Sequence, residues 1–280
     1  MLKTAIKKIF NLYFHSISKV LIGLLRFSNK LPRGRFLVSQ VVESVNNEFT
    51  LIKIREKELF FSTPNWLTHK RATQILVDEP ETISWIDDFS ENSVFWDIGA
   101  NVGIYSIYAA VFKECDVVAF EPSFLNLPIL HRNIDLNGIN DLVTIFPVGL
   151  SDSVGQKRMF FSKANFIPGG AHNSLGKPID QYGNELVDTI NVLIPAETLD
   201  SYLRRFSVRK PDYLKIDVDG LELEILQGGV EVLSNVKSVL IELLGKNQKD
   251  EKIHQFLINC GLKKDSNYNF LTRNVIYTRC

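Results

Sequence analysis

Acidic side chains stand where the short apolar runs of this sequence come to an end. Asp97 lies in the first run, Glu121 follows the second, and Asp152 follows the third. Asp217 and Glu242 close the fourth and fifth runs. A single acidic residue at such a point is usually a solvated strand end or a helix cap, but folding does not require one at all five. Because carboxylates accept hydrogen bonds from ammonium and hydroxyl groups, the pattern predicts a polar ligand site.

The turn after the first run, residues 97–103, indicates which ligand binds there. Gly99 and Gly103 allow the backbone to bend and to approach a ligand closely. A dinucleotide-binding turn needs glycine at its second conserved position so that a pyrophosphate fits, and Asn101 occupies that position. Asp97 would also repel a pyrophosphate, whereas it can accept hydrogen bonds from an ammonium group.

Glu121 follows this turn by about 20 residues, the offset at which an acidic side chain binds the hydroxyl groups of a ribose. A ligand with a ribose, an ammonium group and no phosphate corresponds to S-adenosylmethionine. The residues therefore predict S-adenosylmethionine as the cofactor. An NAD-linked oxidoreductase on a similar sheet is the alternative, and Asn101 and Asp97 both count against it.

The elements that must position these residues form a regular alternation. From residue 94 onward, apolar runs alternate with amphipathic stretches, which predicts an α/β fold with a mostly parallel sheet and helices on both faces. The predicted strands are 94–98, 117–120, 143–146, 213–216 and 239–241. The predicted helices are 103–113, 124–137, 197–205, 221–233 and 249–260. Residues 262–280 indicate an antiparallel pair of strands that turns near 267–269.

Two regions depart from this alternation. Residues 36–62 alternate apolar and polar side chains around Asn46 and Asn47, which indicates a β-hairpin or a small meander, and residues 66–89 look helical with Pro80 dividing them. Residues 153–194 are too long for a plain loop, so we expect an insertion that covers the acceptor side of the site. The expected domains are a basic arm at 1–35, an extension at 36–89 and a cofactor-binding domain at 90–280.

The N-terminal arm is basic. Eight Lys and Arg side chains precede the first acidic residue, Glu43, and apolar residues recur at spacings of three and four along one helical stripe. One interpretation is peripheral contact of residues 2–26 with an anionic membrane surface. The other is docking on the rest of the protein or on a second copy. His15 and Lys19 interrupt the apolar run, so we expect neither a transmembrane span nor a cleaved signal peptide.

The composition excludes several classes of protein. The 280 residues carry 32 basic and 32 acidic side chains, so the net charge is zero and we expect no nucleic-acid partner. Hydrophobic residues at 45% and charged residues at 23% are typical of a globular protein. The three cysteines lie far apart and form no C-x-x-C pair. A reducing cytoplasmic compartment is the simplest interpretation, and peripheral contact at the inner membrane face stays open.

Four motifs stand out between residues 90 and 245. They are WDIGANVGIYS at 96–106, AFEP at 119–122, LSD at 150–152 and LKIDVDG at 214–220 followed by Glu222. In combination they resemble the FkbM family of methyltransferases. The resemblance implies the seven-stranded, Rossmann-like class I methyltransferase sheet and transfer of a methyl group from S-adenosylmethionine to a hydroxyl oxygen. It also implies an acceptor carried on a polyketide, sugar or glycolipid. One departure is Asp219, where the family commonly has glutamate.

The resemblance also implies roles for individual residues. The methionine end of the cofactor would be held by the turn residues Asp97, Gly99, Ala100, Asn101 and Gly103. Glu121 would hold the ribose, and Ser151 and Asp152 would lie beside the adenine. Asp217 would face the transferred methyl group and the acceptor.

Transfer to a sugar hydroxyl calls for a positioned base, because such a hydroxyl is a weak nucleophile. Asp217 is the first candidate. His172 in the insertion is the second, because histidine transfers protons near neutral pH; the alternative is that His172 is an ordinary exposed loop residue. Lys215 is expected to border the site rather than to act as the base.

Two further alternatives stay open from the sequence. Asp217, Asp219, Glu222 and Glu242 offer oxygen ligands for a divalent cation, but Asp219 and Glu222 serve equally well to cap the following helix, and no metal is assigned. The other alternative is a non-catalytic module that only binds S-adenosylmethionine. The sequence does not identify the acceptor or the oligomeric state.

Overall fold

The computed structural model describes residues 16–171, 173–245, 248–268 and 272–279. The chain divides into two compact units, residues 1–48 and residues 49–280. Part of the predicted basic arm, residues 1–15, therefore lies outside the described residues, as does His172, the second candidate base. The domain limits that the sequence suggested at 35/36 and 89/90 stay predictions.

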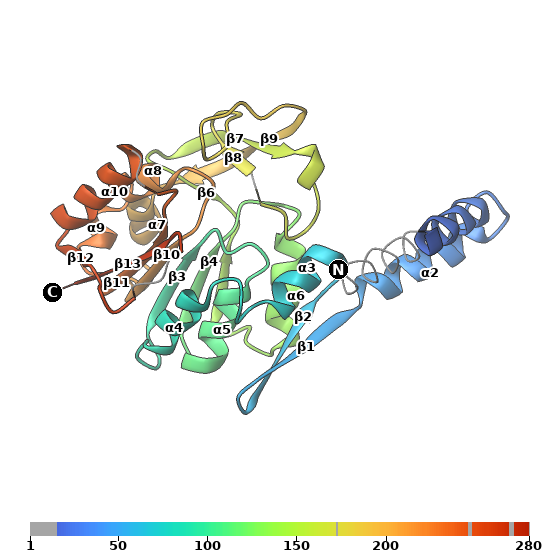
Figure 1. The fold of residues 1–280 in the computed structure, drawn as a ribbon, viewed down its shortest axis with the longest axis horizontal. Helices are drawn as coiled ribbons and strands as arrows, with labels where there is room; N and C mark the ends of the chain where they lie inside the picture. Colours follow the sequence, from blue (N-terminus) through green and yellow to red (C-terminus); the bar gives the residue numbers. More distant parts are fainter. Residues whose placement is uncertain (1–15, 172, 246–247, 269–271, 280) are drawn as a thin grey trace, which may run out of the picture. The chain divides into compact units, whose positions relative to one another are not determined.

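The first unit is a helical hairpin. Residues 16–28 are helical, and a short turn leads into helix α2, Gly34–Asn46 (Figure 1). The strand predicted from residue 36 onward is therefore wrong up to Asn46. Its apolar residues Val38, Val41 and Val45 recur at helical spacings of three and four. The β-branched side chains, which favour strands, concealed that period.

The observed β-hairpin begins after this helix. Strands β1 (Phe49–Ile54) and β2 (Lys57–Ser62) pair antiparallel across a turn at residues 55–56, not at the predicted Asn46 and Asn47. Asn133 of helix α6 (Leu127–Leu136) and Asn137, which directly follows that helix, bind the backbone of β2. Asn133 accepts from the Ser62 amide at 2.6 Å, and Asn137 accepts from the Phe60 amide at 3.0 Å. The hairpin is thereby fixed to the sheet domain.

Seven strands form the central sheet, in the order β12-β13-β11-β10-β3-β4-β5. Its parallel part consists of β5 (Val143–Phe146), β4 (Asp116–Phe120), β3 (Val94–Ile98), β10 (Tyr213–Ile216) and β11 (Ser238–Glu242). The antiparallel part consists of β13 (Asn274–Arg279) beside β11 and β12 (Leu262–Lys264) beside β13. The predicted mostly parallel, Rossmann-like α/β fold is confirmed.

The strand order reverses between β3 and β10. The chain runs from β3 to β4 and β5 on one side, and later to β10 and β11 on the other. Ile98 pairs with Phe120 of β4 and with Ile216 of β10. The residues that follow these three therefore emerge together at one edge of the sheet. A reversal of this kind is where parallel sheets open a crevice for a ligand.

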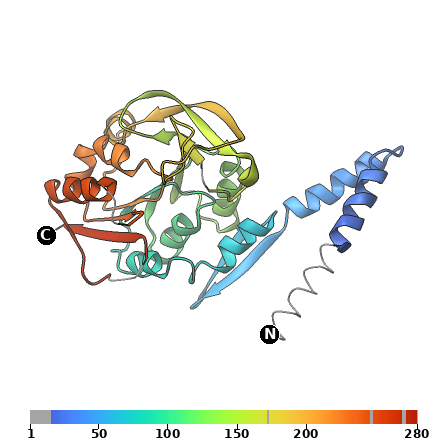
Figure 2. The ribbon, with the colours of Figure 1, turned by 45° about the horizontal axis from the view of Figure 1, so that its top comes forward.

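Helices cover both faces of the sheet (Figure 2). One face carries α4 (Pro80–Asp87), α5 (Ile104–Lys113) and α6 (Leu127–Leu136). The other carries α7 (Leu199–Phe206), α8 (Glu222–Gln227), α9 (Val230–Leu233) and α10 (Gln248–Asn259). Successive strand residues point to opposite faces, so Phe95 packs in the first core and Trp96 in the second. Both cores are rich in aromatic and branched side chains, which fixes the sheet from both sides.

The predicted single helix at 221–233 is interrupted between α8 and α9. Gly228 and Gly229 separate the two helices. An added Cβ on Gly228 would lie 2.4 Å from the carbonyl oxygen of Ser151, and one on Gly229 would lie 2.6 Å from Leu199. The two glycines therefore allow the chain to pass close to its neighbours, and the helix breaks there.

The segment at 153–194 forms most of a second, smaller sheet. Its strands are β6 (Gly149–Leu150), β7 (Gly155–Ser162), β8 (Asn173–Leu175) and β9 (Thr189–Glu197), in the order β6-β9-β7-β8. Met159, Phe161 and Ile194 form a small core of its own. The insertion therefore has a sheet and a small core of its own, and it lies beyond the carboxyl ends of the parallel strands (Figure 1).

Helix α3 (Trp66–Thr73) precedes α4, so the helical region predicted at 66–89 is confirmed with its division before Pro80. Asn65 caps α3 by accepting from the amides of Leu67 and Thr68 at 2.8 and 3.0 Å. Among the helices of the described ranges, none combines the length and apolar character that a membrane crossing requires.

Candidate active site

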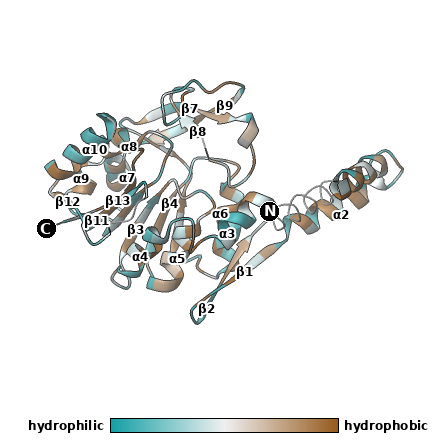
Figure 3. Cartoon of the chain, viewed as in Figure 1, coloured by the Kyte–Doolittle hydropathy of each residue, from teal (hydrophilic) through white to brown (hydrophobic). Residues whose placement is uncertain are grey.

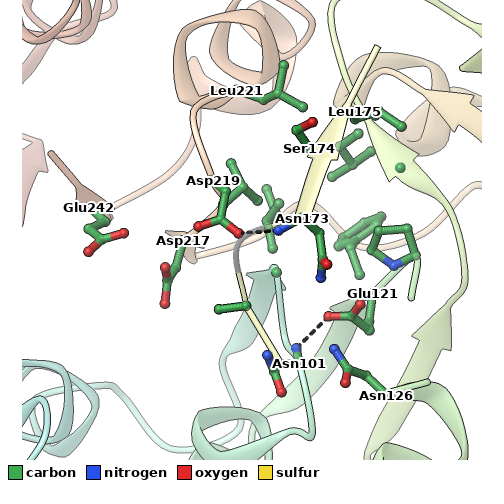
Figure 4. Close-up of a pocket in the computed structure, with 18 of the residues that line it drawn as sticks. Asn101, Glu121, Asn126, Asn173, Ser174, Leu175, Asp217, Asp219, Leu221 and Glu242 are labelled. Carbon is green, nitrogen blue, oxygen red and sulfur yellow. Dashed lines mark hydrogen bonds between the residues drawn. The ribbon is translucent and has the colours of Figure 1, made fainter. Parts of the chain in front are cut away.

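A cavity of about 310 Å³ lies where β3, β4, β10 and β11 end (Figure 4). Its walls include residues that directly follow these strands, Gly99, Glu121 and Asp217 among them. The insertion contributes Met159 and Leu175 to the opposite side. The cavity therefore occupies the crevice expected at the reversal of strand order.

The turn after β3 leaves no room for side chains at its two glycines. Gly99 has a φ of 81°, and a Cβ on it would lie 2.0 Å from the carbonyl oxygen of Asp217. Gly103 has a φ of 84°, and a Cβ on it would lie 2.4 Å from a methyl group of Leu130. Both positions require glycine for conformation and for space. The amides of Gly99 and Ala100 donate to the Phe120 carbonyl at 3.0 and 3.1 Å, which ties the turn to β4.

Glu121 and Asn101, predicted from separate motifs, meet in the cavity. The carboxylate of Glu121 accepts from the Asn101 amide and from the Ser123 amide, each at 2.7 Å. Burial raises the pKa of Glu121 to about 7, although these hydrogen bonds favour its ionised form. The side-chain oxygen of Asn101 is buried, and within the described residues it has no hydrogen-bond partner. The pair therefore offers unsatisfied acceptor capacity to a ligand.

Asp97 lies behind the turn and not on the cavity wall. It is only 1% exposed, and one of its oxygens accepts from the Ser106 hydroxyl at 2.6 Å. Burial raises the pKa of Asp97, against the opposing effect of the Lys215 ammonium group. Ala100 and Gly103 also lie outside the cavity wall. Direct contact of these three residues with a cofactor stays a prediction, whereas their part in shaping the turn is visible.

A loop at 167–171 closes over the turn and is held by four side chains. Asn65 and Arg71 of the α3 region donate to its carbonyl oxygens at 3.1 and 2.7 Å. Asn101 donates to a third carbonyl at 3.1 Å, and Asn126 accepts from a loop amide at 2.8 Å. Asn126 was not among the predicted site residues, although its position just before helix α6 marks it as a residue of the site-forming edge. Three separate elements thus fix the cover of the cofactor side.

Asp217, the first candidate base, forms an ion pair with Lys215. The Lys215 ammonium lies 2.6 Å from the Asp217 carboxylate and 5.0 Å from the centre of the Tyr105 ring. Burial is the largest single effect and would raise the pKa of Asp217, but the charge and hydrogen bond of Lys215, together with smaller effects of Arg71 and Glu242, outweigh it and lower that pKa. Burial alone would lower the pKa of Lys215, but Asp217, Glu79 and Asp97 outweigh it and raise that pKa. Asp217 is therefore held in its ionised form.

Three charged residues that the sequence did not assign to the acceptor surround this pair. Glu79, just before α4, has its pKa raised mainly by burial. Glu242 is the last residue of β11, and burial together with the Asp217 charge raises its pKa to about 7. Arg273 lies 3.8 Å from the Glu242 carboxylate. Glu242 stood out as a strand-end acid and as a possible metal ligand, and no local pattern marks Glu79 or Arg273.

Ser151 and Asp152 lie away from the cavity. The Lys157 ammonium binds the Ser151 hydroxyl at 2.5 Å and the Asp152 carboxylate at 3.0 Å. This contact lowers the pKa of Asp152 to about 2. The cavity wall at this point is formed instead by the preceding residues, Val148 to Leu150. The contact of Ser151 and Asp152 with an adenine stays a prediction. The placement of their side chains beside Lys157 does not favour it.

The four carboxylates considered for a metal engage different partners. Asp219 accepts from the Asn173 amide at 2.9 Å, and Lys249 lies 3.6 Å from Glu222. Figure 4 shows Asp217, Asp219 and Glu242 turned in different directions. Across the part of the chain that the structure describes, no group of three or more His, Cys, Asp or Glu side chains is placed to hold a metal ion.

The profile of the methyltransferase FkbM domain matches residues 97–264, which include the glycine turn, Glu121 and Asp217. The chain belongs to the FkbM methyltransferase family. The resemblance drawn from the motifs is thus confirmed, and the NAD-linked oxidoreductase loses its support. The predicted cofactor, S-adenosylmethionine, is the methyl donor that agrees with this family.

Two curated relatives are similar to this member of the FkbM family. Methyltransferase sdnD of Sordaria araneosa is 27% identical over 177 residues, which are 56% of this chain and 68% of sdnD. The hexuronic acid methyltransferase AglP of Haloferax volcanii is 28% identical over 168 residues, which are 59% of this chain and 62% of AglP. The chain therefore spans about two thirds of these relatives or slightly less.

Solved structures resemble the FkbM-family chain more distantly. The precorrin-6y C5,15-methyltransferase of Geobacter metallireducens is 15% identical with a TM-score of 0.41, covering 72% of this chain and 87% of that one. Streptococcus pneumoniae Sp1610, a putative tRNA methyltransferase solved with S-adenosyl-L-methionine, is 11% identical with a TM-score of 0.41. It covers 70% of this chain and 71% of that one.

Proposed function

We propose that the protein transfers a methyl group from S-adenosylmethionine to a hydroxyl oxygen of a saccharide or a similar small acceptor. The observation that carries the proposal is one continuous cavity whose wall includes Glu121 and Asn101 on one side and Asp217 on the other. A cofactor and an acceptor bound in such a cavity are neighbours, which is the first requirement of direct group transfer.

The residues of the cofactor side fit S-adenosylmethionine. The buried carboxylate of Glu121 would bind the ribose hydroxyls, and the Asn101 oxygen, which has no partner among the described residues, would accept from the ammonium group. Val148, Leu150 and Met159 offer an apolar wall on which an adenine would pack. The bound cofactor would supply a methyl group already activated on a sulfonium. The protein then has to align the acceptor oxygen and remove its proton.

Asp217 is our proposed base. Its carboxylate would accept the hydroxyl proton as the new oxygen–carbon bond forms, and Lys215 keeps it ionised and fixed in position. Orientation supplies several kcal/mol of catalysis in such reactions, and a positioned base adds about 10²–10⁴-fold. The lowered pKa makes Asp217 a weak base, and Glu242 on the same cavity wall, where burial and the Asp217 charge raise its pKa to about 7, would receive the proton next.

The acceptor side suits a polyhydroxylated molecule. Carboxylates of Glu79 and Glu242, the amide of Gln181 and the guanidinium groups of Arg71 and Arg273 line this part of the cavity. Such alternating acceptors and donors bind hydroxyl groups, and arginine also binds a carboxylate. AglP is named for a hexuronic acid, which combines both groups. We therefore propose a sugar or sugar acid as the acceptor class.

The test is methyl transfer by the full-length protein from methyl-labelled S-adenosylmethionine to a panel of neutral glycosides and uronic acids. Mass spectrometry and alkaline treatment of the product distinguish an ether on a hydroxyl from a methyl ester on a carboxylate. We expect an alkali-stable ether that Asp217→Asn abolishes and Glu251→Gln, an exposed change on α10, leaves intact. Binding of S-adenosylhomocysteine without transfer to any acceptor would favour the non-catalytic module.

A further inference from the structure

The first unit presents a helical hairpin with a specifically built turn. Gly34 is buried, and a Cβ on it would lie 1.5 Å from the carbonyl oxygen of Ser28. Arg33 before it adopts a positive φ of 66°, and the Gly34 amide donates to the Leu31 carbonyl at 3.0 Å. The two helices therefore meet closely at residues 28–34, and the residues around this turn have defined positions. We call residues 26–37 the hairpin tip.

Large apolar side chains of the hairpin tip are exposed. The fractional exposure is 62% for Phe27, 48% for Leu31, 66% for Phe36 and 51% for Leu37. Further exposed apolar residues on the two helices are Ile17, Val20, Leu21, Ile22, Leu24, Val41, Val42 and Val45. Figure 3 shows this apolar character along both helices. Single exposed apolar residues are common, but so many on one short helical hairpin indicate a surface that binds something.

The charge of the hairpin tip has one sign. Arg26, Lys30, Arg33 and Arg35 are all exposed, and the sequence from Ser16 to Val42 contains no acidic residue. In a dimer formed about this tip, the same cations would approach each other. A nucleic acid would match the charge but not the exposed aliphatic side chains. An anionic lipid surface matches both, because its headgroups pair with cations while its acyl region accepts apolar side chains.

We propose that the hairpin tip docks the protein on an anionic membrane surface, with its apolar side chains inserted at the interface. The long Arg and Lys side chains would reach outward to the headgroups. The sequence suggested residues 2–26 for this role, which stays a prediction because residues 2–15 lie outside the described residues; the present proposal concerns the tip at residues 26–37. The proposal is independent of methyl transfer.

The test is co-sedimentation of the full-length protein with vesicles of phosphatidylcholine alone and of phosphatidylcholine mixed with phosphatidylglycerol. We expect binding to the anionic vesicles only, weakened by added salt. Phe27→Ser with Phe36→Ser, and separately Arg26→Glu with Arg33→Glu, should each lower the vesicle-bound fraction by about tenfold or more. Matched controls on the second unit should bind normally: Val187→Ser with Leu193→Ser, and Lys252→Glu with Lys263→Glu.

Two results would overturn the proposal. One is equal sedimentation with neutral and anionic vesicles, or none with either. The other is a stable dimer in light scattering that Phe27→Ser with Phe36→Ser dissociates, which would assign the tip to a second copy. Cofactor binding by each variant shows that the second unit is folded, so a lost membrane contact and a misfolded protein are distinguishable.

Discussion

The cofactor side and the acceptor side of the cavity are built in different ways. The polar part of the cofactor side, the glycine turn and Glu121, comes from one continuous stretch, residues 97–126, and main-chain geometry sets its shape. Gly99 and Gly103 adopt conformations that suit glycine, and Glu121 is held by two backbone amides. The acceptor side is formed by the side chains of residues far apart in the chain, from Arg71 to Arg273.

This difference predicts two kinds of failure. The cofactor side depends on main-chain geometry, so a methyl group added at the glycine turn should abolish cofactor binding altogether. The acceptor side is a balance of charges around Lys215, in which Asp217 keeps a lowered pKa while Glu79 and Glu242 have raised ones. Removal of one charge there should change proton transfer while the shape of the cavity stays largely intact.

The largest effect is expected for Asp217→Asn. The amide keeps the size of the carboxylate but cannot accept a proton, so turnover should fall by about 10²–10⁴-fold. Affinity for S-adenosylhomocysteine should change by only a few-fold. Both quantities follow from steady-state kinetics with labelled donor and from calorimetry.

Asp217→Asn also leaves the buried Lys215 charge without its nearest partner; because the Asp217 side chain is 30% exposed, the cost should stay below the roughly 3–5 kcal/mol of a fully buried pair. The double variant Asp217→Asn with Lys215→Met removes both charges. We expect it to regain thermal stability without regaining turnover. Recovery of turnover together with stability would show that Asp217 serves the fold and not the proton transfer.

The second-largest effect is expected at the glycine turn, where main-chain geometry shapes the cofactor side. Gly99→Ala places a methyl group 2.0 Å from a carbonyl oxygen at a φ of 81°, whereas Gly138→Ala has a similar φ of 65° with nothing within 4 Å. Positive φ alone costs about 1–2 kcal/mol, and overpacking adds about 1–3 kcal/mol. Urea unfolding should therefore show a loss of about 2–5 kcal/mol for Gly99→Ala, and calorimetry should show no cofactor binding. Equal losses in the two variants would contradict the role of space at the turn.

The same contrast explains which parts of the site could be predicted from the sequence. Strands such as 94–98 and 213–216, and the pairing of the glycine turn with Glu121, depend on patterns within about 25 residues. The structure confirms those strands and brings Asn101 and Glu121 together. The acceptor side depends on which distant side chains the packing assembles. Arg71, Glu79 and Arg273 therefore carried no local signal.

Local patterns also failed where two signals competed. Residues 36–46 combine valines, which favour strands, with a helical spacing, and the spacing prevailed. The predicted helix at 221–233 had a continuous apolar period, but two glycines that meet Ser151 and Leu199 interrupt it. Ser151 and Asp152 followed a family motif, and Lys157 from the neighbouring strand β7 binds both. In the last two cases a contact outside the motif decided the outcome.

A third effect sharpens the comparison at Glu121. Glu121→Gln keeps the side-chain length but removes the charge and turns an amide group toward a backbone N–H donor. Hydrogen bonds to a charged group contribute about 1.5–3 kcal/mol, so affinity for S-adenosylhomocysteine should fall by about tenfold or more. Glu222→Gln is the matched control, because its pKa is also raised to about 7 but its carboxylate lies beside Lys249 outside the cavity wall. Calorimetry should show unchanged affinity for that control.

The pH dependence of the same group has a defined sign. The pKa of Glu121 is raised by burial from an ordinary 4.5 to about 7, so the folded protein holds a proton in this window that the unfolded chain has released. Its contribution to the free energy of unfolding is therefore complete below about 4.5 and is lost as pH rises through about 7. Cofactor affinity should rise over the same range, since the ionised carboxylate accepts the ribose hydroxyls. Glu121→Gln should bind with a flatter pH profile, whereas Glu222→Gln should keep the slope.

The smallest effect is expected at the cover of the cofactor side. Asn126 is 2% exposed and accepts from the Gly169 amide at 2.8 Å, so Asn126→Ala leaves that amide without its acceptor at a cost of about 1–3 kcal/mol. Asn137→Ala on the same helix removes comparable hydrogen bonds to Phe60, far from the cavity wall. Both variants should lose similar thermal stability, but only Asn126→Ala should weaken S-adenosylhomocysteine binding, by a few-fold. If both variants weakened S-adenosylhomocysteine binding equally, the loop at 167–171 would affect binding only through the general stability of the protein. The cofactor side would then consist of the glycine turn and Glu121 alone.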